Sequence, residues 1–269
     1  MASSFNQEDS LYGTLPALLL VGGMGTRLRP VLSSKPKPLA PLGDIAFLEL
    51  LILQLRSQGI RRLVMCTGYQ SQQIEEALGD GRKWDVAIKY SREASPLGTA
   101  GAIKQAEPHL SEVSAFLVMN GDSFLELDIR KLIRFHQEKE GWASVAVRRV
   151  ADAARYGTVE VDAQDRVVRF SEKVGIQRPG LINGGVYVFK QSVLRRIPEG
   201  PSSLEKDVLP GLVEHGVFAL EQAGMFIDIG TPEDYAHAQT LYQRLSAAAL
   251  SASCHGATSD PIPANPKEK

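Results

Sequence analysis

The chain has 269 residues, 43% of them hydrophobic, which is enough to bury the core of one large α/β domain or of two small ones. Its 30 lysine and arginine residues nearly balance 31 aspartate and glutamate residues, for a net charge of −1. Because this balance supplies no bulk positive field, we expect neither nucleic acid nor a membrane surface as a partner.

The two cysteines, Cys66 and Cys254, form no metal-ligand spacing and indicate a reducing compartment without a disulfide between them. The polar start lacks the basic and apolar regions of a signal peptide, and no apolar stretch approaches the roughly 20 residues of a membrane span. We therefore expect a cytoplasmic protein. Residues 1–14 are predicted to be an N-terminal extension, residues 15–245 a domain, and residues 246–269 a disordered tail rich in alanine, serine and proline.

Short apolar runs alternate with helical periodicity in the first half, which is typical of a mainly parallel sheet covered by helices. The first strand, over 15–21, leads through a glycine-rich turn to a helix that we expect Asp44 to cap and Gly59 to end. The later predicted elements are strands over 62–67, 86–90, 115–119 and 143–148, and helices over 72–78, 99–106 and, capped by Asp128, around 129–136.

The second half has a different pattern. Residues 156–189 read as adjacent strands with turns near 163–165 and 178–180, so we expect a small antiparallel subregion beside the first half. Helices return over 204–215 and 232–245. The pattern as a whole predicts an α/β fold with a mixed central sheet.

Residues 20–30 read Leu-Val-Gly-Gly-Met-Gly-Thr-Arg-Leu-Arg-Pro, a glycine-rich turn leaving the first strand. Glycines let backbone N–H groups approach a polyphosphate closely, and arginine adds a bidentate cation that stays charged. The string matches neither the P-loop, which needs lysine followed by serine or threonine, nor the dinucleotide fingerprint, whose glycine spacing differs. By itself it is equally an ordinary tight turn.

Residues 35–42 add Lys-Pro-Lys-Pro-Leu-Ala-Pro-Leu, and the two segments together closely resemble the signature of the sugar nucleotidyltransferase family. The resemblance covers roughly residues 15–245 and implies a Rossmann-like three-layer αβα fold. It implies that Lys37, rather than Lys35, contacts the triphosphate, and that Arg27, Lys37 and Asp122 are catalytic. The triphosphate site implied at this loop consists of Leu20, Gly22, Gly23, Gly25, Thr26, Arg27 and Lys37.

Two aspartates are candidate metal ligands. Asp122 ends the stretch Asn120-Gly121-Asp122 after a strand, where an open α/β sheet places its ligands, and Asp228 stands between apolar neighbours, where an unpaired charge is costly. A turn alone would explain either one. The resemblance implies that both bind Mg²⁺, which prefers one or two carboxylates plus substrate phosphates, and that Asn120 and Gly121 contact the nucleotide.

Residues 95–101, Ser-Pro-Leu-Gly-Thr-Ala-Gly, resemble the family's base-reading loop. The resemblance assigns to the nucleotide Glu93, Pro96, Gly98 and Thr99. Glu93 falls where thymidylyltransferases of the family carry glutamine. Guanine presents two adjacent donors that one carboxylate accepts together, whereas thymine and uracil flank a single donor with carbonyls. Glu93 therefore favours GTP, and a solvated surface glutamate in a charged run is the alternative.

The sugar 1-phosphate is expected in the antiparallel subregion. By resemblance its pocket is lined by Gly157, Glu172, Lys173, Asn183 and Gly184. A carboxylate can accept sugar hydroxyls while a neighbouring lysine binds the phosphate, and an ordinary solvated Glu-Lys pair is the alternative.

The complete set of motifs is most similar to the D-glycero-α-D-manno-heptose-1-phosphate guanylyltransferases of bacterial surface-polysaccharide pathways. Mannose-1-phosphate guanylyltransferases and glucose-1-phosphate thymidylyl- or uridylyltransferases are close alternatives. The resemblance implies Mg²⁺-dependent transfer of GMP from GTP to the sugar 1-phosphate with release of pyrophosphate, and relatives of this kind often form homo-oligomers. A regulatory subunit that binds nucleotide sugar without turnover is the alternative from another class.

Overall fold

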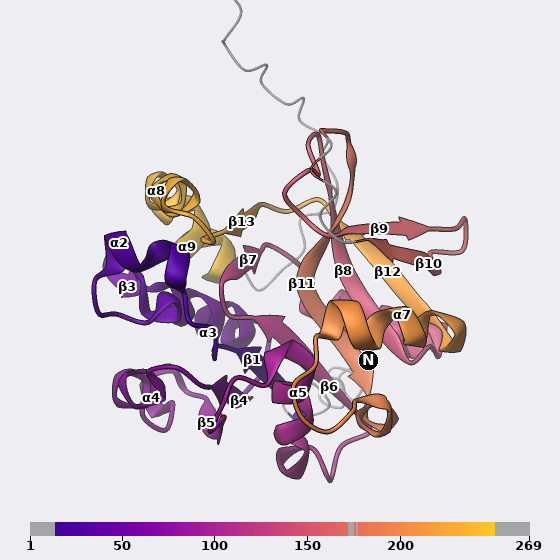
Figure 1. Cartoon of the computed structure of the whole chain (residues 1–269), viewed down its shortest axis with the longest axis horizontal. Helices are drawn as coiled ribbons and strands as arrows, with labels where there is room; N and C mark the ends of the chain where they lie inside the picture. The colour runs from indigo at the N-terminus through magenta and orange to yellow at the C-terminus, as the bar shows by residue number, and fades with distance from the viewer. Residues whose placement is uncertain (1–13, 172–174, 176, 251–269) are drawn as a thin grey trace, which may run out of the picture.

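A computed structural model describes residues 14–171, 175 and 177–250, and its centre is a nine-stranded mixed sheet (Figure 1). The strands of this sheet are β1 (Pro16–Leu20), β4 (Arg62–Thr67), β5 (Ala87–Arg92), β6 (Ala115–Asn120), β8 (Ala143–Val150), β9 (Thr158–Val161), β10 (Val167–Ser171), β11 (Gly180–Lys190) and β12 (Val217–Gln222). In the first half β1 lies between β4 and β6, and both pairings are parallel. The carboxyl ends of these strands therefore meet at one edge of the sheet.

Helices cover both faces of the sheet, which explains why the central parallel strands β1, β4 and β6 are mostly apolar. One face carries α3 (Phe47–Ser57), α4 (Ser71–Leu78), α6 (Ile129–Lys139), α8 (Pro232–Thr240) and α9 (Tyr242–Leu250). The other face carries α5 (Gly98–Gln105), η5 (Gln191–Arg196) and α7 (Leu209–Leu212). The predicted three-layer αβα architecture is confirmed. Among the described helices none is long and apolar enough to cross a bilayer.

Strand β11 joins the two halves of the molecule. Its later part pairs with β6 and its earlier part with β9, while β8 lies along its other side. The register against β8 shifts between Asn183 and Val186. The expected antiparallel subregion is therefore a continuation of the central sheet, and β9 and β10 lie on the side of the molecule away from α3 and α4 (Figure 1).

Two short hairpin-like sheets complete the fold. In one, β7 (Ser123–Leu125) pairs with β13 (Phe226–Asp228). In the other, β2 (Pro41–Leu42) pairs with β3 (Ile45–Ala46), and this pairing corrects one prediction. Asp44 lies in the hairpin turn and does not cap α3; the helix begins after Ala46, whose N–H donates to Glu49 Oε1 at 3.3 Å.

The C-terminal helices differ from their predicted forms. The helix expected over 204–215 consists of a π-helical turn η6 (Leu204–Val208), α7 and a 3₁₀ turn η7 (Val213–His215). The helix expected over 232–245 is two helices, and α9 continues to Leu250, beyond the expected domain end at residue 245. Ala249 is fully buried, and its carbonyl accepts the Ser57 hydroxyl at 2.8 Å, which holds this last turn on α3. The remainder of the expected tail lies outside the described residues.

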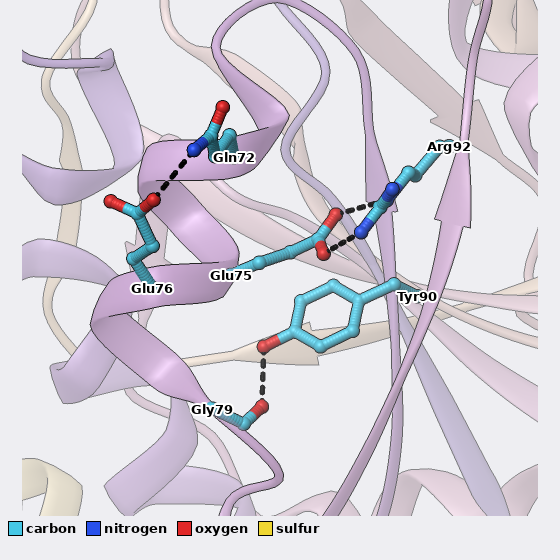
Figure 2. A network of polar contacts seen from close by, with 6 residues as sticks. All are labelled: Gln72, Glu75, Glu76, Gly79, Tyr90 and Arg92. Atoms are coloured by element: carbon cyan, nitrogen blue, oxygen red, sulfur yellow. Dashed lines mark hydrogen bonds and ion pairs between the residues drawn. The ribbon is translucent and has the colours of Figure 1, made fainter.

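A polar network fastens α4 to β5 (Figure 2). The Tyr90 hydroxyl donates to the carbonyl of Gly79 at the end of α4 at 2.6 Å, and the Arg92 guanidinium forms a bidentate ion pair with Glu75. Successive side chains of a strand point to opposite faces of the sheet. Arg92 points toward α4, so Glu93, directly after it, points toward the opposite face.

Candidate active site

A cavity of about 350 Å³ opens where the carboxyl ends of β1, β4 and β6 meet. Most of the predicted nucleotide residues line it, together with the predicted metal ligand Asp122: Leu20, Gly22, Gly23, Lys37, Glu93, Pro96, Gly98, Thr99, Asn120 and Gly121. Its lining also includes residues that the motifs did not indicate: Val21, Met24, Pro38, Cys66 and Ala102. Segments far apart in the sequence thus form one pocket because parallel strands present their ends together.

The glycines of the cavity have two kinds of role. At Gly121 a Cβ would lie 2.5 Å from Val21 Cγ1 and 2.7 Å from the Leu20 carbonyl oxygen, so no side chain fits where β6 ends against β1. At Gly22 a Cβ would lie 3.0 Å from Glu93 Oε1. At Gly23 nothing lies within 4 Å, which leaves open space above a backbone that a phosphate can approach.

Three further residues of the predicted phosphate loop are not among those that line the cavity. Gly25 has a φ of +57°, and a Cβ there would lie 2.9 Å from Lys37 Cβ, so the loop packs closely on that lysine. Thr26 and Arg27 begin the short turn η1 (Thr26–Leu28) and are exposed. Within the described residues Arg27 forms no ion pair, so its guanidinium is available to an anionic ligand.

The cationic side of the cavity is formed by Lys37. Its Nζ lies 2.8 Å from Asp122 Oδ2, and its side chain is 13% exposed compared with 46% for the aspartate. Lys35, two residues earlier, is exposed. The turn η2 (Lys37–Leu39) therefore directs only the second lysine toward the carboxylate.

Asp228 lies beside Asp122 through the pairing of β13 with β7, in which it is opposite Ser123. The N–H of Ile229 donates to the backbone carbonyl of Asp122 at 3.0 Å. Burial and then the negative charge of Asp122 raise the pKa of Asp228, while Lys37 lowers it. Asp228 Oδ1 is buried without a hydrogen-bond partner. Two adjacent carboxylates with one unsatisfied oxygen fit a divalent cation.

Glu93 forms another wall of the cavity and is half-buried. Its Oε2 accepts the N–H of Leu97 at 3.0 Å. Burial raises the pKa of Glu93, and this hydrogen bond lowers it. Because Arg92 is paired with Glu75, Glu93 does not belong to a solvated charge run. Its carboxylate faces a pocket large enough for a ligand.

Of the residues predicted to bind the sugar phosphate, Asn183 and Gly184 lie at the irregularity of β11 and Gly157 directly precedes β9; none of them lines the cavity. The N–H of Asn183 donates to the Gly157 carbonyl at 3.0 Å. Asn183 Nδ2 donates to the Tyr187 hydroxyl at 2.5 Å. At Gly184 a Cβ would lie 2.6 Å from Leu125 Cδ2, so this glycine lets β11 approach β7.

The other predicted sugar residues, Glu172 and Lys173, lie outside the described residues. The structure adds one residue that the motifs did not indicate, Tyr156, whose ring meets that of Phe226 edge-on at 5.5 Å between centroids. Burial and then Asp228 raise the pKa of Tyr156. Its place directly before Gly157 was the only sequence signal for it.

The nucleotidyl transferase family model matches residues 16–244. Mannose-1-phosphate guanylyltransferase of Mycobacterium tuberculosis is 37% identical over 223 residues, which cover 81% of this chain and 62% of that protein. The chain thus spans less than two thirds of that relative.

Two shorter relatives match over nearly their whole length. D-glycero-α-D-manno-heptose 1-phosphate guanylyltransferase of Campylobacter jejuni is 37% identical over 224 residues, covering 83% of this chain and 98% of that one. The crystal structure of HddC from Yersinia pseudotuberculosis, complexed with GMP-PN, has a TM-score of 0.77 and 33% identity, covering 85% of this chain and 100% of that one.

Proposed function

The chain belongs to the nucleotidyl transferase family, and from that membership we propose that it is a sugar-1-phosphate guanylyltransferase. The observation that carries the proposal is the meeting of the glycine loop, Lys37, Asp122 and Glu93 in one cavity, with Asp228 beside it. This set combines anion-binding, metal-binding and base-reading groups in a single pocket.

In the proposed reaction a phosphate oxygen of the sugar 1-phosphate attacks the α-phosphorus of the nucleoside triphosphate. The bond from that phosphorus to the bridging oxygen breaks, and pyrophosphate leaves. The attacking oxygen is already anionic, so no protein nucleophile or base is required. The protein contributes positioning and charge neutralisation.

The residues have distinct roles in this proposal. Arg27 and the amides of the glycine loop bind the triphosphate, and Lys37 offsets its charge. Asp122 and Asp228 hold Mg²⁺, which when bound neutralises charge on the reacting phosphates. Mg²⁺ characteristically takes its remaining ligands from phosphate and water, so two carboxylates suffice. On the sugar side we propose Gly157, Glu172, Lys173, Asn183 and Gly184.

Several observations support GTP as the donor. Glu93 places a half-buried acceptor group against the cavity, which suits the paired N–H donors of guanine. Two of the relatives are guanylyltransferases by name, and HddC is complexed with a guanine nucleotide analogue, GMP-PN.

We favour D-glycero-α-D-manno-heptose 1-phosphate as the acceptor because the match to the Campylobacter jejuni heptose 1-phosphate guanylyltransferase covers 98% of that enzyme's length. Mannose 1-phosphate is the alternative, supported by a relative with equal identity. The product would serve surface polysaccharide synthesis in the cytoplasm, a location that accords with the free thiol of Cys66. A homo-oligomer is expected, and light scattering would measure it.

The test is pyrophosphate release with Mg²⁺, crossing GTP, dTTP, UTP, CTP and ATP with heptose, mannose and glucose 1-phosphates. Release with GTP and one preferred sugar phosphate is expected. Arg27→Ala and Asp122→Ala should abolish turnover with an unchanged circular dichroism spectrum, and Lys35→Ala is the matched control. Silence of the folded wild-type protein across all combinations would refute the proposal.

A further inference from the structure

The base-reading loop is held by a segment from the other half of the sequence. The carbonyl of Ser202 accepts the N–H groups of Ala100 and Gly101 at 3.0 and 3.3 Å, and its own N–H donates to the Leu97 carbonyl at 2.8 Å. Gly98 has a φ of +70°, and a Cβ there would lie 2.5 Å from the Ser202 oxygen. The segment after residue 200 therefore sets the position of this cavity wall.

The side chain of Glu205 extends this connection. Its Oε2 accepts the hydroxyls of Thr99 and Ser203 at 3.0 and 3.2 Å. Each of these hydroxyls also accepts a backbone N–H near the start of η6, at 2.7 and 3.3 Å respectively. Because an ionised carboxylate only accepts hydrogen bonds, both hydroxyl protons are directed to Glu205.

A third hydroxyl completes the set around Glu205. Tyr187 is fully buried and lies close enough to the Glu205 carboxylate for that charge to act on its hydroxyl. Its oxygen accepts Asn183 Nδ2 at 2.5 Å, which leaves its proton available to Glu205. Burial and then the charge of Glu205 hold the pKa of Tyr187 well above its usual value, so it remains a donor at any working pH.

These contacts form one chain: Thr99 is hydrogen-bonded to Glu205, Glu205 acts electrostatically on Tyr187, and Tyr187 is hydrogen-bonded to Asn183. Thr99 lines the nucleotide cavity, and Asn183 lies at the irregularity of β11 where the sugar phosphate is proposed to bind. Glu205 itself is in the π-helical turn η6, a rare conformation that occurs frequently at functional sites. Glu205 is not among the residues that line the nucleotide cavity.

We propose that Glu205 is a positioning residue that aligns the two substrates by fixing Thr99 relative to Asn183. This inference rests on the proposed transferase function. An in-line displacement needs the attacking oxygen and the α-phosphorus aligned, and a misplacement of about 1 Å can cost roughly 100-fold in rate. Glu205 therefore affects turnover without contacting GTP or the sugar phosphate.

The first test is Glu205→Gln, which preserves the shape of the side chain but presents an NH₂ group to a hydroxyl that is itself a donor. We expect kcat to fall about 10- to 100-fold with a melting temperature within a few degrees of wild type. Tyr187→Phe breaks the same chain at its next member and should give a comparable loss. Glu214→Gln, an exposed glutamate in the following turn, is the matched control.

The double variant separates positioning from simple stability. If both residues act through one chain, Glu205→Gln with Tyr187→Phe should lower kcat no further than the single changes. Wild-type kcat and KM in Glu205→Gln would overturn the inference, as would losses that multiply in the double variant. Both outcomes leave the proposed function intact, because wild-type turnover is measured beside them.

A silent wild-type protein would refute the proposed function, and calorimetric GTP binding would then decide the inference alone. Glu205→Gln should still weaken GTP binding several-fold by releasing Thr99. Equal affinity in the variant and the wild type, or no binding by either, would overturn it.

Discussion

Lys37 and Asp122 form a close ion pair, with 2.8 Å between Nζ and Oδ2, at the position where the proposed metal must bind. The same lysine also acts on Asp228, whose pKa it lowers. In the nucleotide-free protein Lys37 therefore pairs with Asp122 and offsets part of the negative charge around Asp228. Phosphate and Mg²⁺ together can replace it, because the phosphate attracts the ammonium as the metal takes the carboxylates.

Lys37→Met should lower kcat/KM by about 100-fold or more, because an aligned charge at the transferring phosphate is lost. It should also strengthen Mn²⁺ binding to the nucleotide-free protein, since Asp122 and Asp228 lose their competing cation. Electron paramagnetic resonance of free Mn²⁺ measures this affinity. Lys35→Met is the control, and unchanged Mn²⁺ affinity in Lys37→Met would exclude the competition.

Asp228→Asn should abolish activity yet stabilise the metal-free protein. A raised pKa means that the folded state favours the protonated form, so this contribution to stability is present at low pH and is lost as pH rises through the folded pKa. At neutral pH the charge opposes folding, and the amide should raise the unfolding free energy by on the order of 1 kcal/mol. Urea unfolding in EDTA provides the measurement. A less stable variant would show that Asp228 has a compensating partner.

Glu93→Gln should weaken selection for GTP over UTP and dTTP. The amide can accept one guanine donor but faces the second with its own NH₂, and loss of a bidentate pair is worth about 1–3 kcal/mol. The ratio of kcat/KM values between nucleotides is the readout. Glu75→Gln is an informative comparison because it alters the neighbouring network on α4 without reaching the cavity. An unchanged ratio in Glu93→Gln would exclude base reading by this residue.

Alanine substitutions at two glycines of the cavity should have different effects, because Gly23 faces open space and Gly121 faces closely packed atoms. At Gly23 nothing lies within 4 Å, so Gly23→Ala should fold normally but raise the KM for GTP about tenfold or more by obstructing the phosphate. Gly211→Ala, at an equally open position in α7, should leave KM unchanged. Gly121→Ala should instead unfold at lower temperature, because its Cβ would overlap Val21. Normal GTP affinity in Gly23→Ala would contradict phosphate binding at that backbone.

Because His136 is buried, we expect the free energy of unfolding to fall at acid pH. Burial, and then the charge of Lys190, lower the pKa of His136 to about 4. Its contribution to stability is therefore present above about pH 6.5 and lost as pH falls toward 4, a change of about 2–3 kcal/mol. Urea unfolding across this range should show a shallower pH dependence for His136→Asn than for wild type. His237→Asn, on an exposed face of α8, should retain the wild-type slope; an equal slope in His136→Asn would contradict the prediction.

Elements whose structure depends on a local sequence pattern could be predicted from the sequence alone. The apolar run of β4 was predicted to the residue, and the glycine loop and Lys37 were found because their spacing is contiguous. Asp44 was misassigned because the hairpin over 41–46 is stabilised from elsewhere. The Tyr235 hydroxyl donates to the Pro41 carbonyl, and Gly43 packs under the ring of Tyr242. No local pattern near Asp44 reports contacts with α8 and α9.

Glu205 was missed for a related reason. Its segment reads as an ordinary amphipathic helix, whereas its partner Thr99 comes from α5 and the pair Tyr187 and Asn183 comes from β11. The positions of Asn183 and Gly184 at a register shift were equally invisible, because a β-bulge is defined by the neighbouring strand. The sequence motifs therefore predicted residues that line one cavity, whereas the hydrogen bonds that join distant segments had no signal in the sequence.

The place of β11 between β6 and β8 affects how this protein is made. On the ribosome β6 emerges long before β11, so its free edge stays exposed until Lys190 has left the exit tunnel. Unpaired edges of this kind favour aggregation and slow folding. The nucleotide half consequently cannot mature as an independent early module, and a fragment ending near residue 150 should require chaperone protection rather than fold alone.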